Sequence, residues 1–465
     1  MQVEPYVRCR FDGQRADTPE EQTEFTADGK PYTVQRFVLG SAPAKLPIPV
    51  PRCPELQALI QQMEAMPAPD GFRRITHLLV DAGPLIDKED LQSRLKFETF
   101  LFSLKHLNYD AIGLSGEELL VKNELKPSEL PPLVMTNMAE PARQTFEALG
   151  YLQKTLAAGE EQLDCLVLSL ARELPASATD HQKKLVQLQD SAAAVKEMLA
   201  SLNIDPEKST PDRLIVVTMS EKNKGLAEKL QQMPALDVIA TVGTADEPEL
   251  CEAKTGPVMV TTGRLGKYIV RIDVPFGYRD NPSQLRFQRI AIEEDFEKDA
   301  VIVSRIDDYQ LQMQIEQLVE DETKIVRQPL EGGNRFVGNV SCGAADCHED
   351  IYQKWREFRH GYALETLEKV NRQYDPSCVS CHTVGMAYES GFRSREKTPD
   401  LADVGCEMCH GPGEKHQQDV YEEYQTVFTA CEQCHDHESS PKFEKEREDY
   451  FKKIEHWTVP REYWE

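Results

Sequence analysis

The last third of the chain contains four pairs of cysteines, each followed directly by a histidine. Three pairs have the spacing Cys-x-x-Cys-His, and the first is a wider relative with four residues between its cysteines. The four motifs are Cys342-Cys347-His348, Cys378-Cys381-His382, Cys406-Cys409-His410 and Cys431-Cys434-His435. Two thiols one helical turn apart can each bond a vinyl group of haem, and the histidine then ligates the iron from below. The spacing therefore predicts redox chemistry at four covalently bound c-type haems.

Zinc is the competing interpretation, because paired Cys-x-x-Cys motifs also build zinc ribbons and knuckles. A zinc site does not require a histidine after the second cysteine of every pair. Histidine makes up only 11 of the 465 residues, so its recurrence at this position favours haem. Two other interpretations of the first motif stay open: a haem held by a single thioether, or an unrelated pair of cysteines.

Four more histidines follow in the same segment, so eight imidazoles are present for four irons. His360 lies on a predicted helix, and His416 follows a Gly-Pro-Gly turn that can place it over a neighbouring ring. Both are predicted distal ligands, and His456 is a further candidate. His437 is too close to His435 to reach the opposite face of the same haem. It can serve another haem, make a supporting hydrogen bond or be solvated.

Composition changes near Pro329–Gly333, which marks a domain boundary. We therefore expect one domain over residues 1–332 and a second, mainly α-helical multihaem domain over residues 333–465. Long aliphatic runs disappear after about Gly338, and such a sequence has too little apolar surface to fold alone. The haems are expected to supply its core, much as a structural metal does for a small domain.

The haem-binding segment, over roughly residues 336–437, resembles the tetrahaem cytochrome c that accepts electrons from hydroxylamine oxidation in nitrifying bacteria. The residues that carry the resemblance are Val340 to His348, Tyr352 to Trp355 with Arg359 and His360, Asp375 to Gly385, and Gly405 to Gly413 with His416. The resemblance implies that His416 is the distal ligand of the first haem and His360 that of the third. It also implies a five-coordinate second haem on His382, and a distal ligand of the fourth haem from further on, His456 or His437. The widened first motif departs from the family pattern.

Short β-rich apolar runs alternate with helical stretches before residue 330, which is typical of α/β architecture. The predicted strands lie at 75–80, 111–114, 133–135, 214–218, 238–241, 258–261 and 268–274, and the predicted helices at 91–107 and 226–232. Residues 180–203 read as one amphipathic helix.

Residues 70–280 resemble the metallophosphatase fold of bacterial 5'-nucleotidases, an α/β sandwich. The residues that carry the resemblance are Leu79 to Gly83, Leu107 to Ile112, Leu236 to Ile239 and Thr262 to Gly266. Those enzymes hold two metal ions with Asp, Asn and His. Here the corresponding positions are Gly83-Pro84, Ser115 to Glu118, Met219-Ser220 and Gly243 to Asp246. We therefore expect a catalytically inactive scaffold with no catalytic residues.

The formal charge of −26 argues against nucleic acid and favours basic redox partners or other cytochromes. No apolar run is long enough for a membrane span, and a homo-oligomer is compatible with the sequence. Because bacteria attach haem covalently outside the cytoplasmic membrane, we expect a periplasmic protein whose secretion signal was removed before Met1.

Two functions compete on this evidence. The first is an electron carrier with four haems and no enzymatic activity, in which mostly bis-histidine ligation gives low potentials. The second is a haem enzyme that acts on a small nitrogen species, nitric oxide or hydroxylamine, at an open haem on His382. The histidine count favours the carrier, since eight histidines are enough to supply two ligands to each of four irons.

Overall fold

The computed structural model describes residues 35–40, 77–121, 127–158, 161–210, 213–243, 245, 247–251, 256–263, 266–274, 286–292, 296–321, 323–420, 428–436, 440 and 442–456. The chain divides into two compact units, Met1–Ile306 (unit 1) and Asp307–Glu465 (unit 2). This division lies inside helix α7 (Ala300–Ile315), earlier than the predicted boundary at 332. The segment in between packs within unit 2, where Val319 and Ile325 join its hydrophobic cluster.

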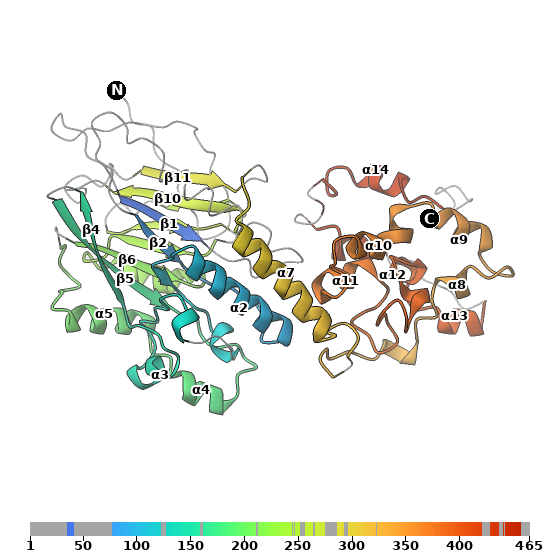
Figure 1. Cartoon of the computed structure of the whole chain (residues 1–465), viewed down its shortest axis with the longest axis horizontal. Coiled ribbons are helices and arrows are strands. Elements are labelled where there is room, and N and C mark those ends of the chain that lie inside the picture. Colours follow the sequence, from blue (N-terminus) through green and yellow to red (C-terminus); the bar gives the residue numbers. More distant parts are fainter. Residues whose placement is uncertain are drawn as a thin grey trace, which may run out of the picture. The chain divides into compact units, whose positions relative to one another are not determined.

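Unit 1 contains two mixed β-sheets (Figure 1). One has the strand order β11-β10-β1-β2-β3 and the other β4-β5-β6-β7-β9-β8. The strands are β1 (Gln35–Gly40), β2 (Leu78–Asp81), β3 (Ala111–Ile112), β4 (Leu152–Ala158), β5 (Glu161–Leu170), β6 (Arg213–Met219), β7 (Val238–Thr241), β8 (Leu250–Cys251), β9 (Val258–Thr261), β10 (Tyr268–Val274) and β11 (Arg286–Ala291). The predicted strand at 133–135 is reduced to isolated bridges, from Leu133 to Ile112 and from Val134 to Leu149.

The alternating side chains of the strands separate into three layers of apolar core. In β2, Leu78 and Val80 face the layer between the two sheets, whereas Leu79 faces the outer layer under α2 (Leu91–His106). In the second sheet, Val167 faces inward, and Leu168 packs outward against α5 (Ser191–Ser201) and α6 (Lys224–Gln231). Helices therefore cover the outer faces of two packed sheets, and the predicted α/β class is confirmed.

The predicted helix at 180–203 is wrong as one element, because the structure has two. The first, α4 (Asp180–Val186), ends where Gln187 adopts a left-handed backbone with φ of 49°. The second, α5, starts after Asp190, whose carboxylate caps it by accepting a hydrogen bond from the Ala193 N–H. A side chain that caps a new helix competes with continuation of the previous one. Leu185 of α4 is 44% exposed.

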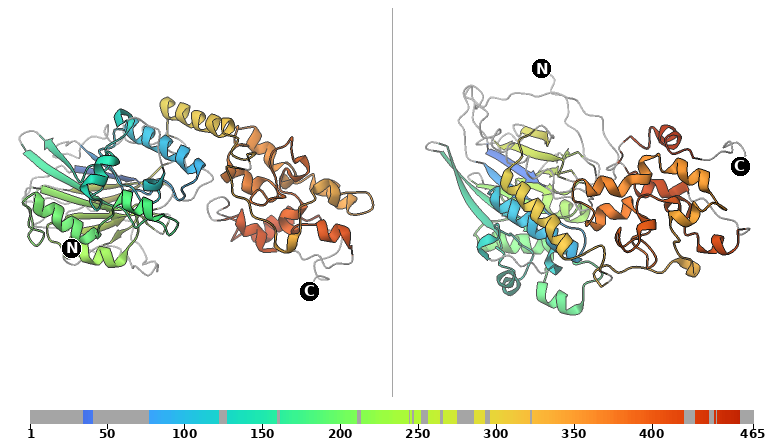
Figure 2. Two further views of the ribbon diagram at one scale, coloured as in Figure 1. Left: turned by 90° about the horizontal axis from the view of Figure 1, so that it is seen from below. Right: turned by 45° about the vertical axis from the view of Figure 1, so that its right-hand side comes forward.

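The described part of unit 2 consists of short helices and loops (Figure 2). They are α8 (Asn339–Cys342), α9 (Glu349–Trp355), α10 (Ala363–Glu368), α11 (Pro376–His382), α12 (Cys406–His410), α13 (Glu414–Gln418) and α14 (Arg447–Lys452), with 3-10 turns that include η7 (Arg359–Tyr362) and η9 (Phe428–Gln433). A small apolar cluster around Leu364, Val379 and Phe392 joins them. Among the described helices of the chain, none is long and apolar enough to cross a bilayer.

Candidate haem-binding site

The Cys-x-x-Cys-His motifs lie on single helical turns. The second and third motifs occupy α11 and α12, and each helix ends at its histidine. The fourth motif follows the same path without a regular helix, because the His435 N–H donates to the Cys431 carbonyl at 2.8 Å. This bond spans four residues, as in an α-helix, and brings both thiols and the imidazole to one side of the turn. The three motifs are therefore arranged as covalent haem attachment requires.

Three pairs of histidine rings lie at similar separations, with angles of 9° (His348 and His416), 46° (His360 and His435) and 85° (His410 and His456) between the ring planes. The ring centroids are 6.5 Å apart for His348 and His416, 6.0 Å for His360 and His435, and 6.2 Å for His410 and His456. Two imidazoles that ligate one iron from opposite sides, each at roughly 2 Å, have ring centres about 6 to 6.5 Å apart. The three separations are therefore compatible with one iron between the rings of each pair.

The ring contacts differ in two cases from the distal assignments implied by the family resemblance. His416 faces the first motif, as expected. His360 lies beside His435 of the fourth motif rather than the third, and His456 lies beside His410 of the third rather than the fourth. The difference arises because these contacts join segments that are distant in sequence. The order of the motifs along the chain does not specify which of these segments meet. His437, the alternative ligand, lies outside the described residues.

Hydrogen bonds orient several of these rings. The Nδ1 atom of His382 lies 2.8 Å from the carbonyl oxygen of Ala363, and that of His456 lies 2.7 Å from the Ile454 carbonyl oxygen. Nδ1 of His435 lies 2.7 Å from the hydroxyl of Ser440. A carbonyl can only accept, so Nδ1 of His382 and of His456 must donate. Nε2 is then the unprotonated nitrogen available to a metal.

Burial also favours the ligating form of the rings. Desolvation is the main cause that lowers the pKa of His360, to about 4, and it lowers the pKa of His410 and His435. A ring with such a lowered pKa is neutral at neutral pH, and neutral imidazole is the form that binds iron.

His382 differs from the other motif histidines. The three ring pairs do not include it, although it lies near enough to His360 to help lower the pKa of that ring. Its ring stays oriented by the Ala363 carbonyl, and the Thr366 hydroxyl lies 3.4 Å from the same nitrogen. The motif therefore presents one positioned ligand, and none of the three pairs among the described residues gives it a second imidazole.

Cysteines of different motifs lie side by side. A hydrogen bond between the thiols of Cys342 and Cys406 raises the pKa of Cys342 and lowers that of Cys406. A second bond, between Cys381 and Cys434, lowers the pKa of the Cys381 thiol to about 7. These thiols stand for the thioether sulfurs of attached haems. The first motif therefore adjoins the third, and the second adjoins the fourth.

A buried carboxylate anchors the third motif. Glu407, between Cys406 and Cys409, accepts hydrogen bonds from the backbone N–H groups of Val337, Gly338 and Gly413, at 2.7 to 3.1 Å. Its side chain thus ties the segment before the first motif to the turn after the third. Sequence reasoning missed this residue, because a glutamate inside a spacer reads as an ordinary solvated side chain.

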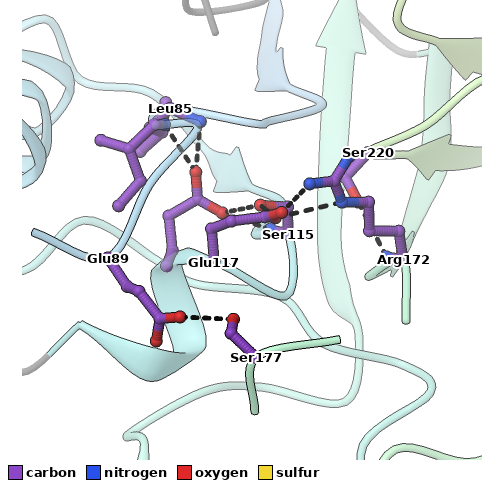
Figure 3. Close-up of polar contacts among 9 residues, drawn as sticks. Leu85, Glu89, Ser115, Glu117, Arg172, Ser177 and Ser220 are labelled. Carbon is purple, nitrogen blue, oxygen red and sulfur yellow. Dashed lines mark hydrogen bonds and ion pairs between the residues drawn. The ribbon is translucent and has the colours of Figure 1, made fainter. Parts of the chain in front are cut away.

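Unit 1 contains a separate polar network where the phosphatase resemblance places its metal ligands (Figure 3). Glu118 accepts from the backbone N–H groups of Leu85 at 2.6 Å and Ile86 at 2.7 Å, and from that of Ser115 at 2.6 Å. Glu117 is ion-paired with Arg172, whose Nε donates to it at 3.0 Å. The two carboxylates are thus bound by hydrogen-bond donors and by one cation.

Two more residues complete this network. The Ser220 hydroxyl accepts from the Arg172 backbone N–H at 2.9 Å, and Asp81 accepts from the Gly83 N–H at 2.7 Å. Burial raises the pKa of Asp81 to about 7, and the nearby Glu118 adds to the rise. The segment Gly243 to Asp246 stands at another position where the phosphatases hold metal. Its residues Thr244 and Asp246 lie outside the described residues.

The haem-binding segment matches a family model described as "Cytochrome c554 and c-prime" over residues 341–411. Cytochrome c-554 of Nitrosomonas europaea is 32% identical over 107 residues, which cover 20% of this chain and 45% of that protein. This chain thus spans less than half the length of the curated relative. The reduced-state structure of the Nitrosomonas europaea cytochrome c554 is 27% identical and covers 26% of this chain and 59% of its own, with a TM-score of 0.17.

Solved structures similar to this chain include a sulfate thiohydrolase and 5'-nucleotidases. A Thermus thermophilus sulfate thiohydrolase is 14% identical with a TM-score of 0.44, and covers 62% of each chain. A 5'-nucleotidase precursor, also from Thermus thermophilus, is 13% identical with a TM-score of 0.43, and covers 72% of this chain and 68% of its own. The C-terminal part of this chain therefore matches the cytochrome c554 family model, and it follows an N-terminal α/β unit.

Proposed function

We propose that the protein is an electron carrier that holds four c-type haems in unit 2. The observation that carries the proposal is the set of three histidine pairs, each built from one motif histidine and one distant histidine. Bound haem iron supplies a one-electron couple, and two imidazole ligands favour a low potential. The residues proposed to hold the haems are the eight motif cysteines and seven histidines: Cys342, Cys347, Cys378, Cys381, Cys406, Cys409, Cys431 and Cys434, with His348, His360, His382, His410, His416, His435 and His456.

The neighbouring thiols support a linear order of the four sites. Cys381 of the second motif contacts Cys434 of the fourth, and Cys342 of the first contacts Cys406 of the third. The third and fourth motifs are linked as well: burial raises the pKa of the Cys409 thiol to about 11, and the nearby Cys431 adds to the rise. We therefore propose the order second, fourth, third, first, with His382 at one end and His348 at the other.

A second candidate function, turnover of a small nitrogen species such as nitric oxide or hydroxylamine, rests on His382. None of the three ring pairs among the described residues includes it, so an exogenous ligand has a place to bind. The nearest charged loop gives little support to acid–base chemistry, because the Arg393 guanidinium is buried and donates to backbone carbonyls of its own loop, including that of Gly391 at 3.0 Å. The carrier proposal is favoured for this reason.

For unit 1 we propose a catalytically inactive scaffold. The support is the network around Glu117, Glu118 and Arg172, in which a guanidinium and backbone N–H groups neutralise the carboxylates where a hydrolase would place metal ions. We further propose that the cytochrome domain proper begins at residue 333. The segment 307–332 would then be a connector bound to it, through contacts such as the Arg327 bond to the Met386 carbonyl at 3.1 Å.

Charge supports basic redox partners or other cytochromes. Residues 307–465 contain 33 acidic and 18 basic residues, a formal charge of −15 within the total of −26. Haem propionates would add negative charge, so docking to a basic surface is steered electrostatically. We propose a periplasmic or other extracytoplasmic location, where covalent haem attachment takes place, and a role in nitrogen-cycle electron transfer.

The test is an intact-mass haem count followed by carbon monoxide titration of the fully reduced protein. Four haems, with about a quarter of the Soret intensity shifting, support four sites of which one, on His382, is open. No shift with four haems would show that all four irons have two protein ligands, and would remove the enzymatic alternative. Absence of covalent haem would refute the carrier proposal.

A further inference from the structure

We infer that the widened first motif is a complete haem-attachment site that bonds its haem through both Cys342 and Cys347, with the longer spacer looped out of the turn. The inference rests on the proposed function, and it concerns the motif that departs from the usual spacing. It competes with the two other interpretations left open by the sequence, a single thioether and an unrelated cysteine pair.

The backbone closes this motif in the same way as a standard one. In the fourth motif, the His435 N–H donates to the Cys431 carbonyl at 2.8 Å. In the first, the His348 N–H donates to the Cys342 carbonyl at 3.1 Å, although two more residues separate them. The second cysteine directly precedes the histidine in both. The first cysteine and the histidine are therefore joined by the same backbone hydrogen bond in both motifs, whereas the second cysteine differs: the Cys434 N–H donates to the Cys431 carbonyl, and the Cys347 N–H donates to that of Ala344.

The extra residues form a separate turn. The Cys347 N–H donates to the Ala344 carbonyl at 2.9 Å, and residues 344–346 are exposed. A turn that satisfies its own hydrogen bond and projects into solvent absorbs the added length without displacing the cysteines. The insertion thus changes the spacer and leaves the attachment residues in place.

Close packing fixes the base of this turn. A Cβ atom added to Gly343 would lie 2.4 to 2.7 Å from three side-chain atoms of Tyr352, well inside van der Waals contact. Tyr352 belongs to α9 and stacks on Trp355, whose indole N–H donates to the Val404 carbonyl at 3.0 Å. Glycine at 343 therefore lets the spacer lie against a side chain that is itself held in place.

The reactive groups are also placed as in the other motifs. His348 faces His416 at 6.5 Å with an angle of only 9° between the rings, and the Cys342 thiol contacts that of Cys406. Each thiol would add across one vinyl double bond: a carbon–sulfur bond forms at one vinyl carbon, and the thiol hydrogen goes to the other. Nothing is oxidised or reduced in this addition, so no further reactant is needed.

The direct test uses the full-length protein matured with covalent haem, denatured and alkylated with iodoacetamide before tryptic digestion. Residues 336–354 form one tryptic peptide that contains both cysteines and no others. We expect this peptide to carry one haem and no alkyl group. One haem with one alkyl group would overturn the double attachment, and two alkyl groups without haem would overturn the site.

Two internal controls separate this inference from the proposed function. The peptide of residues 416–442 contains the standard fourth motif and should carry haem without alkylation, whereas Cys165, which belongs to no haem motif, should be alkylated once the protein is denatured. Haem on the 416–442 peptide but not on the 336–354 peptide refutes only the inference. Haem on neither peptide refutes the carrier proposal itself.

Substitutions test the packing of the spacer. Gly343→Val should lower the count from four haems to three, because the branched side chain collides with Tyr352. Adding Tyr352→Ala should restore the fourth haem, and Ala345→Val at the exposed turn should retain all four. Four haems in Gly343→Val alone would contradict the packing argument. Deleting Ala344 and Ala345, which recreates Cys-x-x-Cys-His, should preserve four haems.

Discussion

The imidazole rings of His348 and His416 lie nearly parallel, 9° apart in orientation and 6.5 Å apart between centroids. One histidine follows the second cysteine of the first motif, and the other lies on α13, which follows the Gly411 to Gly413 turn. Their arrangement fits two ligands on opposite sides of one iron. His416 is also the distal ligand that the family resemblance implies for the first haem.

Replacing His416 with alanine should open the first haem without detaching it, because the covalent bonds come from other residues. Carbon monoxide should then shift the Soret band of one more haem than it does in the wild-type protein. The exposed His181 of α4, remote in sequence from the motifs, provides the control, and His181→Ala should leave the shift unchanged. Equal carbon monoxide binding in His416→Ala and wild type would contradict the pairing.

The exchanged distal ligands can be distinguished in a protein that lacks the fourth haem. In a Cys431→Ala, Cys434→Ala background, removal of His360 should expose no new carbon-monoxide-binding iron, because the iron that it ligates is absent. Removal of His456 should expose one, on His410. The order implied by the family resemblance predicts the opposite result for the two variants, so one titration series decides between them.

Removing the Arg172 guanidinium should destabilise unit 1, since it leaves the buried Glu117 carboxylate without its cation. Removing one partner of a buried ion pair costs on the order of 3–5 kcal/mol, and the partial exposure of Arg172 lowers the expected loss to about 2 kcal/mol. Calorimetric melting of Arg172→Ala measures it. Lys196→Ala, which removes an exposed ion pair with Glu207, should change stability by less than about 0.5 kcal/mol. Similar losses in both variants would argue against a special role for the network.

Stability of unit 1 should depend on pH through Asp81. Burial raises the pKa of this carboxyl from 3.8 to about 7 in the folded protein. Between these values the folded state binds the proton more tightly than the unfolded state, so the contribution of Asp81 to stability falls as pH rises from about 4 to 7 and is constant above. Asp81→Asn retains an oxygen that can accept from Gly83 and should abolish this slope. Its stability relative to wild type should therefore increase with pH, by up to about 4 kcal/mol; a pH-independent difference would contradict the shift.

The sequence by itself determined the haem chemistry and the order of many elements. A Cys-x-x-Cys-His motif acts within one helical turn, so its chemistry depends only on neighbouring residues. Strands β7, β9 and β10 begin and end at the predicted residues, because each is a short apolar run with clear ends. The break between α4 and α5 was missed, since the capping role of Asp190 competes locally with an uninterrupted apolar stripe.

Only the tertiary structure decided how distant residues are combined. His360 and His435, or Glu117 and Arg172, come together through the packing of separate segments, and no local spacing encodes such a contact. The first motif is a further example. Its spacer is longer than in the other motifs, yet the His348 N–H donates to the Cys342 carbonyl, a contact that only the folded chain reveals. Chemistry that depends on adjacent residues can be inferred from the sequence. The pairing of ligands depends on loop closure over many residues and is fixed only when the chain folds.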